Sequence, residues 1–488
     1  MNADRYSPSL ARYLLTGAAF AVAVTSAALC GAGDYRAGFS CAVAAFGVAA
    51  TMIVRPPIET VLLTWVLATP LLSSFVHLPS DDPVITYDRV SLGLIVVLMA
   101  VQRIANRGPD PTIQGIANRG PDPTIQRFEI AWVALCVIAL ASVATQSNHL
   151  GYSLRIAVDA FCLPLIAFHS ARNHLADRGR GHILLGGAAA VALFLFATGA
   201  YELLARADLF PFEGSQLVRE SEVRVNGPFQ SDSSYAVICL MLALFLRAAP
   251  RALSVRLDRG ARIIHRSAVA CAAVASLFPL YRIVGAALLV SWVALEAAIS
   301  RRRETTLLTS RRARAAAAVV LLTLAGAALL FEASSQGRLS SARNVYGRVA
   351  TWEAGIGIVL DRPLFGAGLT NYNDYFNSKY SRADQWRGSI GNARPVGYPH
   401  SNGLWIAAEL GMAAFVLFVI ANVYLFLIGY RGLRRAVTAQ QRTAAGCFVA
   451  LLLAYWIPGL TLTSGAYSDL NLYFFFLLGL LSTRSEQG

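Results

Sequence analysis

Charged residues are scarce in this chain. They make up 14% of its 488 residues, while hydrophobic residues make up 56% and the mean hydropathy is +0.52. An average soluble domain carries about 25% charged residues. This shortage excludes a soluble, charge-covered domain for most of the chain and indicates an integral membrane protein, with the lipid bilayer as a partner.

Paired cysteines and cofactor motifs are lacking as well. The seven cysteines stand singly on or near apolar segments, so their spacing predicts neither a disulfide framework nor a zinc site. The sequence contains no CxxC, HExxH, Walker A or dinucleotide-binding pattern. Redox and nucleotide chemistry therefore have no support in the sequence, and we expect no cofactor.

Long apolar segments are abundant. A helix of roughly 17–25 apolar residues crosses the ~30 Å hydrocarbon core of a bilayer. Fourteen segments qualify, and they predict an all-α polytopic protein with about 12–14 transmembrane helices: 11–30, 37–54, 59–77, 88–103, 128–146, 151–169, 181–204, 233–249, 264–280, 284–300, 313–332, 404–428, 443–461 and 468–484. The first segment is as long as the others, which favours a signal anchor over a cleaved signal peptide.

Arginine-rich connections set the orientation. With a cytoplasmic N-terminus, the loops "ARNHLADRGRGH", "RAAPRALSVRLDRGARIIHR", "SRRRETTLLTSRRARA" and "YRGLRRAVTAQQRT" all face inward, as the positive-inside rule requires. These loops account for most of the net charge of +14, so the charge does not point to a nucleic-acid partner. We expect N-terminal helices over 1–332, an outward loop over 333–403 and C-terminal helices over 404–488. An inner linker holds the duplicated "IANRGPDPTIQ" at 104–126.

Three outward connections carry arginine, although the positive-inside rule predicts few arginines on the outer side. They are "RESEVRVNGPFQSDSSYA" with Arg224, "PLYRIVGA" with Arg282 and "SARNVYGRVATWEAG" with Arg348. The planar guanidinium binds phosphate oxygens bidentately, so together they are suited to a lipid-linked diphosphate. Solvated loop charges or snorkelling side chains are the structural alternative.

The stretch "VGYPHSNGLWIAAELG" gathers polar residues where a span begins. Pro399 and the apolar spacing from Leu404 predict that His400 and Asn402 lie at a helix N-terminus, with Glu409 about two turns further on. A neutral histidine is a natural general base for a sugar hydroxyl. The alternative is a capping segment in which Ser401 or Asn402 caps the helix and His400 is only adjacent.

The segment "YGRVATWEAGIGIVLDRPLFGAGLTNY" contains a Pro-Leu-x-Gly-x-Gly turn and is followed by "PHSNGLWIAAELG". Through these features residues 345–415 resemble the bacterial O-antigen ligase and polysaccharide polymerase superfamily. The segment "RVNGPFQSDSSYA" is similar to the family's Arg-x-x-Gly-x-Phe segment, with "QSDSS" in place of the family's Pro-Asn. Gly366 and Gly368 either let backbone approach a bulky ligand or form a plain turn.

The resemblance implies a metal-independent, inverting membrane glycosyltransferase of the bacterial inner membrane. Its donor is a glycan on undecaprenyl diphosphate, and its acceptor is lipid A core or a growing polysaccharide on the periplasmic face. By position, His400 matches the base, and Arg224, Arg282 and Arg348 match the diphosphate-binding arginines, with Asn402, Glu409, Gly366 and Gly368 in support.

Two alternatives stay open from the sequence. Ligation onto a core and polymerisation of repeat units use the same chemistry, so the residues do not separate them. A transporter or flippase for a lipid-linked glycan would also have many helices and a cationic cavity, and interrupted helices would favour it.

Overall fold

The computed structural model describes twelve ranges of the chain: 58–72, 77–78, 85–105, 122–175, 180–207, 209–210, 218–219, 222–223, 225–229, 231–300, 343–378 and 398–486. The chain divides into two compact units, Met1–Gly120 and Pro121–Gly488. The predicted boundaries at 332 and 403 are not tested by this division and stay predictions.

The described part of the first unit is a pair of helices. Helix α3 (Ile58–Leu72) and helix α4 (Tyr87–Ala105) are joined through two short antiparallel strands, β1 (His77–Leu78) and β2 (Ile85–Thr86). The buried carboxylate of Asp88 holds the helices together. It accepts hydrogen bonds from Trp65 Nε1 at 2.9 Å and from Thr69 Oγ1 at 3.0 Å.

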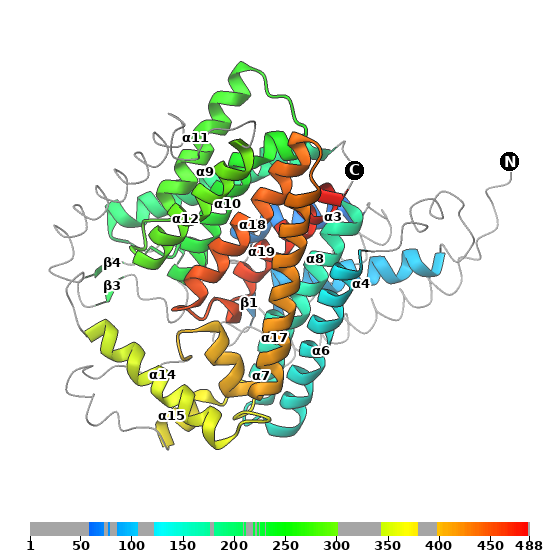
Figure 1. Ribbon diagram of the computed structural model, residues 1–488. Helices are drawn as coiled ribbons and strands as arrows, with labels where there is room; N and C mark the ends of the chain where they lie inside the picture. The colour runs from blue at the N-terminus through cyan, green and yellow to red at the C-terminus, as the bar shows by residue number, and fades with distance from the viewer. Residues whose placement is uncertain are drawn as a thin grey trace, which may run out of the picture. The chain divides into compact units, whose positions relative to one another are not determined.

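The second unit is a helical bundle (Figure 1). Its elements are α6 (Pro123–Gln146), α7 (Leu150–Ala157), the π-helix η1 (Val158–Cys162), α8 (Leu163–His174), α9 (Gly181–Ala205), β3 (Val218–Arg219), β4 (Glu222–Val223), α10 (Asp232–Ala252), α11 (Arg259–Ala275), α12 (Arg282–Ser300), α14 (Arg343–Asp361), α15 (Tyr372–Ser378), α17 (Asn402–Arg435), α18 (Ala439–Gly459), the 3-10 helix η4 (Ser464–Ala466) and α19 (Ser468–Glu486). Helix α10 is the most buried of the apolar helices and packs against α9, α11, α12, α18 and α19.

The all-α polytopic class predicted from the sequence is confirmed. Seven helices in the described ranges are long and apolar enough to cross a membrane: Pro123–Gln146, Leu150–His174, Gly181–Ala205, Asp232–Ala252, Arg282–Ser300, Asn402–Arg435 and Ala439–Gly459. Four other predicted spans overlap α3, α4, α11 and α19. The remaining three, at 11–30, 37–54 and 313–332, lie outside the described residues.

The duplicated linker ends earlier than the sequence suggests. Residues Pro123 to Gln126 of its second copy form the first turn of α6, with Asp122 as N-cap accepting a hydrogen bond from the backbone of Thr124 at 2.7 Å. Asp at the N-cap followed by Pro is a favourable helix start. The second copy is therefore part linker and part membrane helix.

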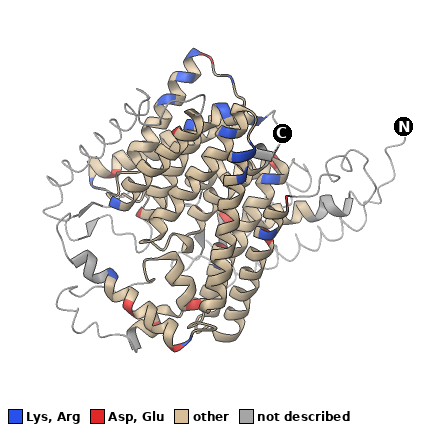
Figure 2. Ribbon diagram, viewed as in Figure 1, with Lys and Arg blue, Asp and Glu red and all other residues tan. Residues whose placement is uncertain are grey.

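Arginines gather at one end of the bundle (Figure 2). The connections from α10 to α11 and from α17 to α18 carry them, and Gln440 Nε2 donates to Ala252 O at 3.3 Å between these two connections. Both therefore lie at the same end of the second unit, as the positive-inside prediction requires.

Helix α17 is two helices joined at a sharp break. Gly411 has φ 84° and ψ 174°, which no helix contains. A Cβ built on Gly403 would lie 3.2 Å from a ring atom of Phe415. Twelve residues of straight helix span about 18 Å, so the short piece 402–410 must fold back along the long piece 412–435. The prediction of one continuous span over 404–428 is wrong in this respect, because Gly411 interrupts it.

Candidate functional site

His400 lies in the half-buried segment just before α17. Its backbone is in the left-handed region, with φ 49°, which is uncommon for a residue other than glycine. Tyr398 holds this segment in place: its hydroxyl lies 3.1 Å from the hydroxyl of Tyr152, and its ring packs edge-on against Trp405 at 5.8 Å. A strained residue held by its surroundings is typical of functional sites.

A cation and an anion from two other helices act on His400. Burial and the nearby guanidinium of Arg348 lower the pKa of His400 to about 4, while the carboxylate of Asp232 opposes this shift. Arg348 comes from α14 and Asp232 from α10, so three distant segments of the chain meet here. The imidazole is consequently neutral at physiological pH and able to accept a proton.

Asp232 is the site residue that the sequence analysis missed. It is the first residue of α10, and its Oδ1 accepts hydrogen bonds from the Tyr281 hydroxyl at 2.8 Å and from Ser233 N at 2.9 Å. Its position after Ser231 reads as ordinary helix capping, and Ser231 does serve as N-cap. In the sequence, this segment stood out only because it has "QSDSS" where the resembled family has Pro-Asn. That difference did not suggest a role for the carboxylate of Asp232.

The three predicted arginines have different outcomes. Arg348 lies near enough to His400 to lower the pKa of its imidazole, and its role in binding a diphosphate stays a prediction. Arg282 begins α12 and is exposed, directly after the tyrosine that bonds Asp232. Arg224 lies outside the described residues, so its place in the site stays a prediction.

Asn402 does not cap the helix that it begins. Its buried side chain accepts a hydrogen bond from Gly465 N at 2.8 Å, and Asn471 Nδ2 donates to Gly465 O at 2.7 Å. Ser401 occupies the N-cap position without a side-chain capping bond. Asn402 therefore ties the His400 segment to the turn between α18 and α19, and the capping alternative has no hydrogen bond in its favour.

Glu409 is fully buried beneath the site. It accepts hydrogen bonds from Trp405 Nε1 at 2.7 Å and from Tyr372 N at 3.3 Å. A buried carboxylate is tolerated only when donors surround it, and these two come from α17 and from the start of α15. Glu409 thus joins the start of α15 to the short helix that follows His400.

Gly366 and Gly368 approach protein rather than an open space. A Cβ on Gly366, which has φ 67°, would lie 2.5 Å from the backbone of Glu409, and one on Gly368, with φ 94°, would lie 2.9 Å from Gln146 Cβ. Ala367 N and Gly368 N donate to the carbonyls of Ala408 and Glu409 at 2.8 and 2.9 Å. The turn interpretation of these glycines is therefore the one that the geometry supports, and they dock the turn onto the end of the piece 402–410.

No group of three or more His, Cys, Asp or Glu side chains that could hold a metal ion occurs in the described ranges. The chain matches no protein-family model and no curated protein.

Proposed function

We propose that this protein is a membrane glycosyltransferase of the O-antigen ligase type, with His400 as its general base. The observation that supports this most is that Arg348 of α14 and Asp232 of α10 both lie near enough to His400, just before α17, to act on the pKa of its imidazole. A neutral imidazole beside an arginine and a carboxylate is the arrangement that proton removal next to an anionic leaving group requires.

The proposed reaction is a single displacement. Nε2 or Nδ1 of His400 accepts the proton of the acceptor hydroxyl, whose oxygen attacks the anomeric carbon of the lipid-linked sugar. The bond from that carbon to the diphosphate oxygen breaks, and its electron pair leaves with the diphosphate. The anomeric configuration is inverted, and the donor is a glycan on undecaprenyl diphosphate.

The arginines would bind the diphosphate. The positive charge of Arg348 lowers the pKa of His400, and Arg282 and Arg224 would complete the cationic set. A guanidinium fork stabilises the charge that builds on the leaving oxygen. A bound diphosphate would also favour the protonated imidazole, raising the pKa of His400 toward neutrality when the base is needed.

Asp232 supplies the negative charge that acts on the same imidazole. Its carboxylate is fixed by Tyr281 and by the N-terminus of α10, so it can stabilise the imidazolium that forms on proton transfer. Lipid A core and a growing polysaccharide are both suitable acceptors. Ligation onto the core is the proposed reaction, and repeat-unit polymerisation is the alternative that the same residues would support equally.

The test is a transfer assay on a purified lipid-diphosphate glycan with His400→Ala. We expect a loss of roughly 10²- to 10⁴-fold in rate, the usual contribution of a general base. His149→Ala is the matched control, because His149 is an exposed histidine of another outward connection. If the folded His400→Ala protein transfers at the wild-type rate, His400 is not the general base and the proposal is wrong.

A transporter of lipid-linked glycans is the second candidate. The break at Gly411 is the observation that favours it, because interrupted helices line the binding sites of many transporters. Sealed vesicles separate the two functions: movement of the lipid between leaflets without any glycosidic bond formation indicates transport.

A further inference from the structure

Helix α14 and the turn after it expose large apolar side chains. The exposed fractions are 53% for Ile356, 75% for Leu360, 65% for Leu364 and 70% for Phe365. Ile356, Leu360 and Leu364 are spaced four residues apart, so the first two share one face of the helix and the third follows just beyond its end. An apolar patch of this size on an outward connection indicates a contact surface.

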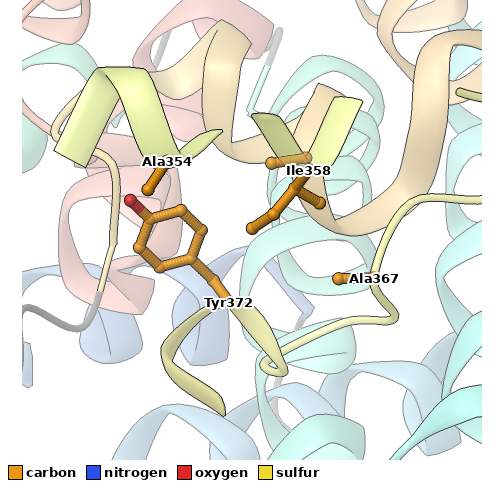
Figure 3. Close-up of a cluster of buried hydrophobic side chains, with 5 residues drawn as sticks. Ala354, Ile358, Ala367 and Tyr372 are labelled. Carbon is orange, nitrogen blue, oxygen red and sulfur yellow. The ribbon is translucent and has the colours of Figure 1, made fainter. Parts of the chain in front are cut away.

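The opposite face of α14 is already occupied. Ala354 and Ile358 pack into a buried cluster with Ala367, Tyr372 and Ala408 (Figure 3). The Tyr372 hydroxyl donates to Thr351 O at 2.6 Å, which fixes the rotation of the helix about its axis. The exposed apolar stripe therefore points away from the buried cluster, and α14 is apolar on two sides.

The stripe ends beside the start of a helix long and apolar enough to span a membrane. Met412 N donates to Pro363 O at 2.7 Å, so the turn carrying Leu364 and Phe365 is fixed to the first residue of the piece 412–435. Further along the chain, that piece exposes more apolar side chains: Val416, Val419, Ile420 and Val423.

The length of the piece 412–435 places the turn at the outer edge of the hydrocarbon. Its 24 residues extend about 36 Å, against a hydrocarbon core of ~30 Å. Arg431, Arg434 and Arg435 mark its inner end. Met412 therefore lies close to the outer boundary of the core, and Leu364 and Phe365 lie beside it.

We propose that the C-terminal half of α14 and the turn at 362–365 insert into the outer leaflet, with the exposed stripe contacting lipid acyl chains. Leu360, Leu364 and Phe365 are the inserted residues, and Asp361 and Arg362 lie at headgroup level. Helix α14 is then an interfacial helix anchored at Leu360. Arg348 lies twelve residues before Leu360, which is about 18 Å along the helix. This anchoring does not depend on the proposed transfer reaction.

Site-specific photocrosslinking in proteoliposomes tests the insertion. Phe365 is replaced by benzoylphenylalanine, a conservative change, in the full chain in phosphatidylcholine vesicles, and irradiation is followed by peptide mass analysis. We expect adducts with the mass of phosphatidylcholine at position 365, as at Val419 on the spanning piece. The same probe at His149, a polar exposed position, should give no more than a small fraction of that yield.

Two outcomes would overturn the proposal. One is a yield of lipid adducts at 365 as low as that at 149, and the other is a predominant adduct with a protein segment, which would show that another polypeptide covers the stripe. If the protein carrying the probe at 365 does not fold, the probe at Leu360 tests the same surface, because that side chain is the most exposed of the stripe.

Discussion

His400 is a histidine that the folded protein keeps uncharged. Burial and Arg348 hold its pKa at about 4, whereas an unperturbed histidine has a pKa of about 6.5. Between these values the unfolded chain binds more protons than the folded one, so protonation opposes folding. The stabilising contribution of the neutral ring is present above about pH 6.5 and is lost as the pH falls through about 4.

This linkage predicts that the melting temperatures of the wild type and of His400→Gln depend differently on pH. The melting temperature of the wild type should fall more steeply than that of His400→Gln as the pH is lowered from 7.5 to 4, because glutamine does not titrate. Thermal unfolding in the same detergent measures both curves. His149→Gln is the control and should follow the wild type. Parallel curves for the wild type and His400→Gln would mean that His400 is not held neutral.

At the scale of elements, the break in α17 decides where His400 lies. Gly411 ends the piece 402–410, whose last carbonyls are bonded by Ala367 N and Gly368 N of the preceding turn. The short piece therefore folds back, and its first residue, Asn402, reaches Gly465 in the turn between α18 and α19. A straight helix would carry Asn402, and with it His400, away from that turn.

The folded-back arrangement predicts a selective crosslink. A protein with Gly403→Cys and Phe415→Cys should be joined by a short bis-maleimide, because these two positions are adjacent. A second protein with Phe415→Cys and Leu427→Cys has the same separation of twelve residues within the uninterrupted piece. Those thiols lie about 18 Å apart, so the short reagent should not join them. Peptide mass analysis distinguishes the two, and equal behaviour would contradict the fold-back.

At the scale of the whole molecule, the arrangement of charge predicts which ends of the helices face outward. The connection between α6 and α7 lies at the end opposite the arginine-rich one, so His149→Cys should react with an impermeant maleimide in intact cells. Arg259→Cys, exposed at the start of α11 in the arginine-rich connection, should react only after the membrane is opened. Labelling of position 259 in intact cells would reverse the orientation and place His400 on the inner side.

The sequence by itself determined that the protein lies in a lipid bilayer and that its fold is helical. Apolar segments of membrane-spanning length predict helices because a bilayer offers no partner for backbone groups. The start of a helix at Asn402 was predictable for a similar local reason, since Pro399 and the apolar spacing after it act within a few residues. Such signals need no information about the rest of the chain.

The tertiary structure decided the composition of the site and the roles of its supporting residues. Asp232 and Arg348 lie 116 residues apart in sequence, and no local pattern shows that both charges act on His400. From the sequence, Gly366 could either approach a ligand or form a turn and Glu409 had only a supporting role, whereas in the structure both hold the segment between α14 and α15 against α17. The break at Gly411 was hidden because hydropathy is an average over a window, while a reversal of direction depends on one backbone conformation and on the carbonyls that the neighbouring turn can bond.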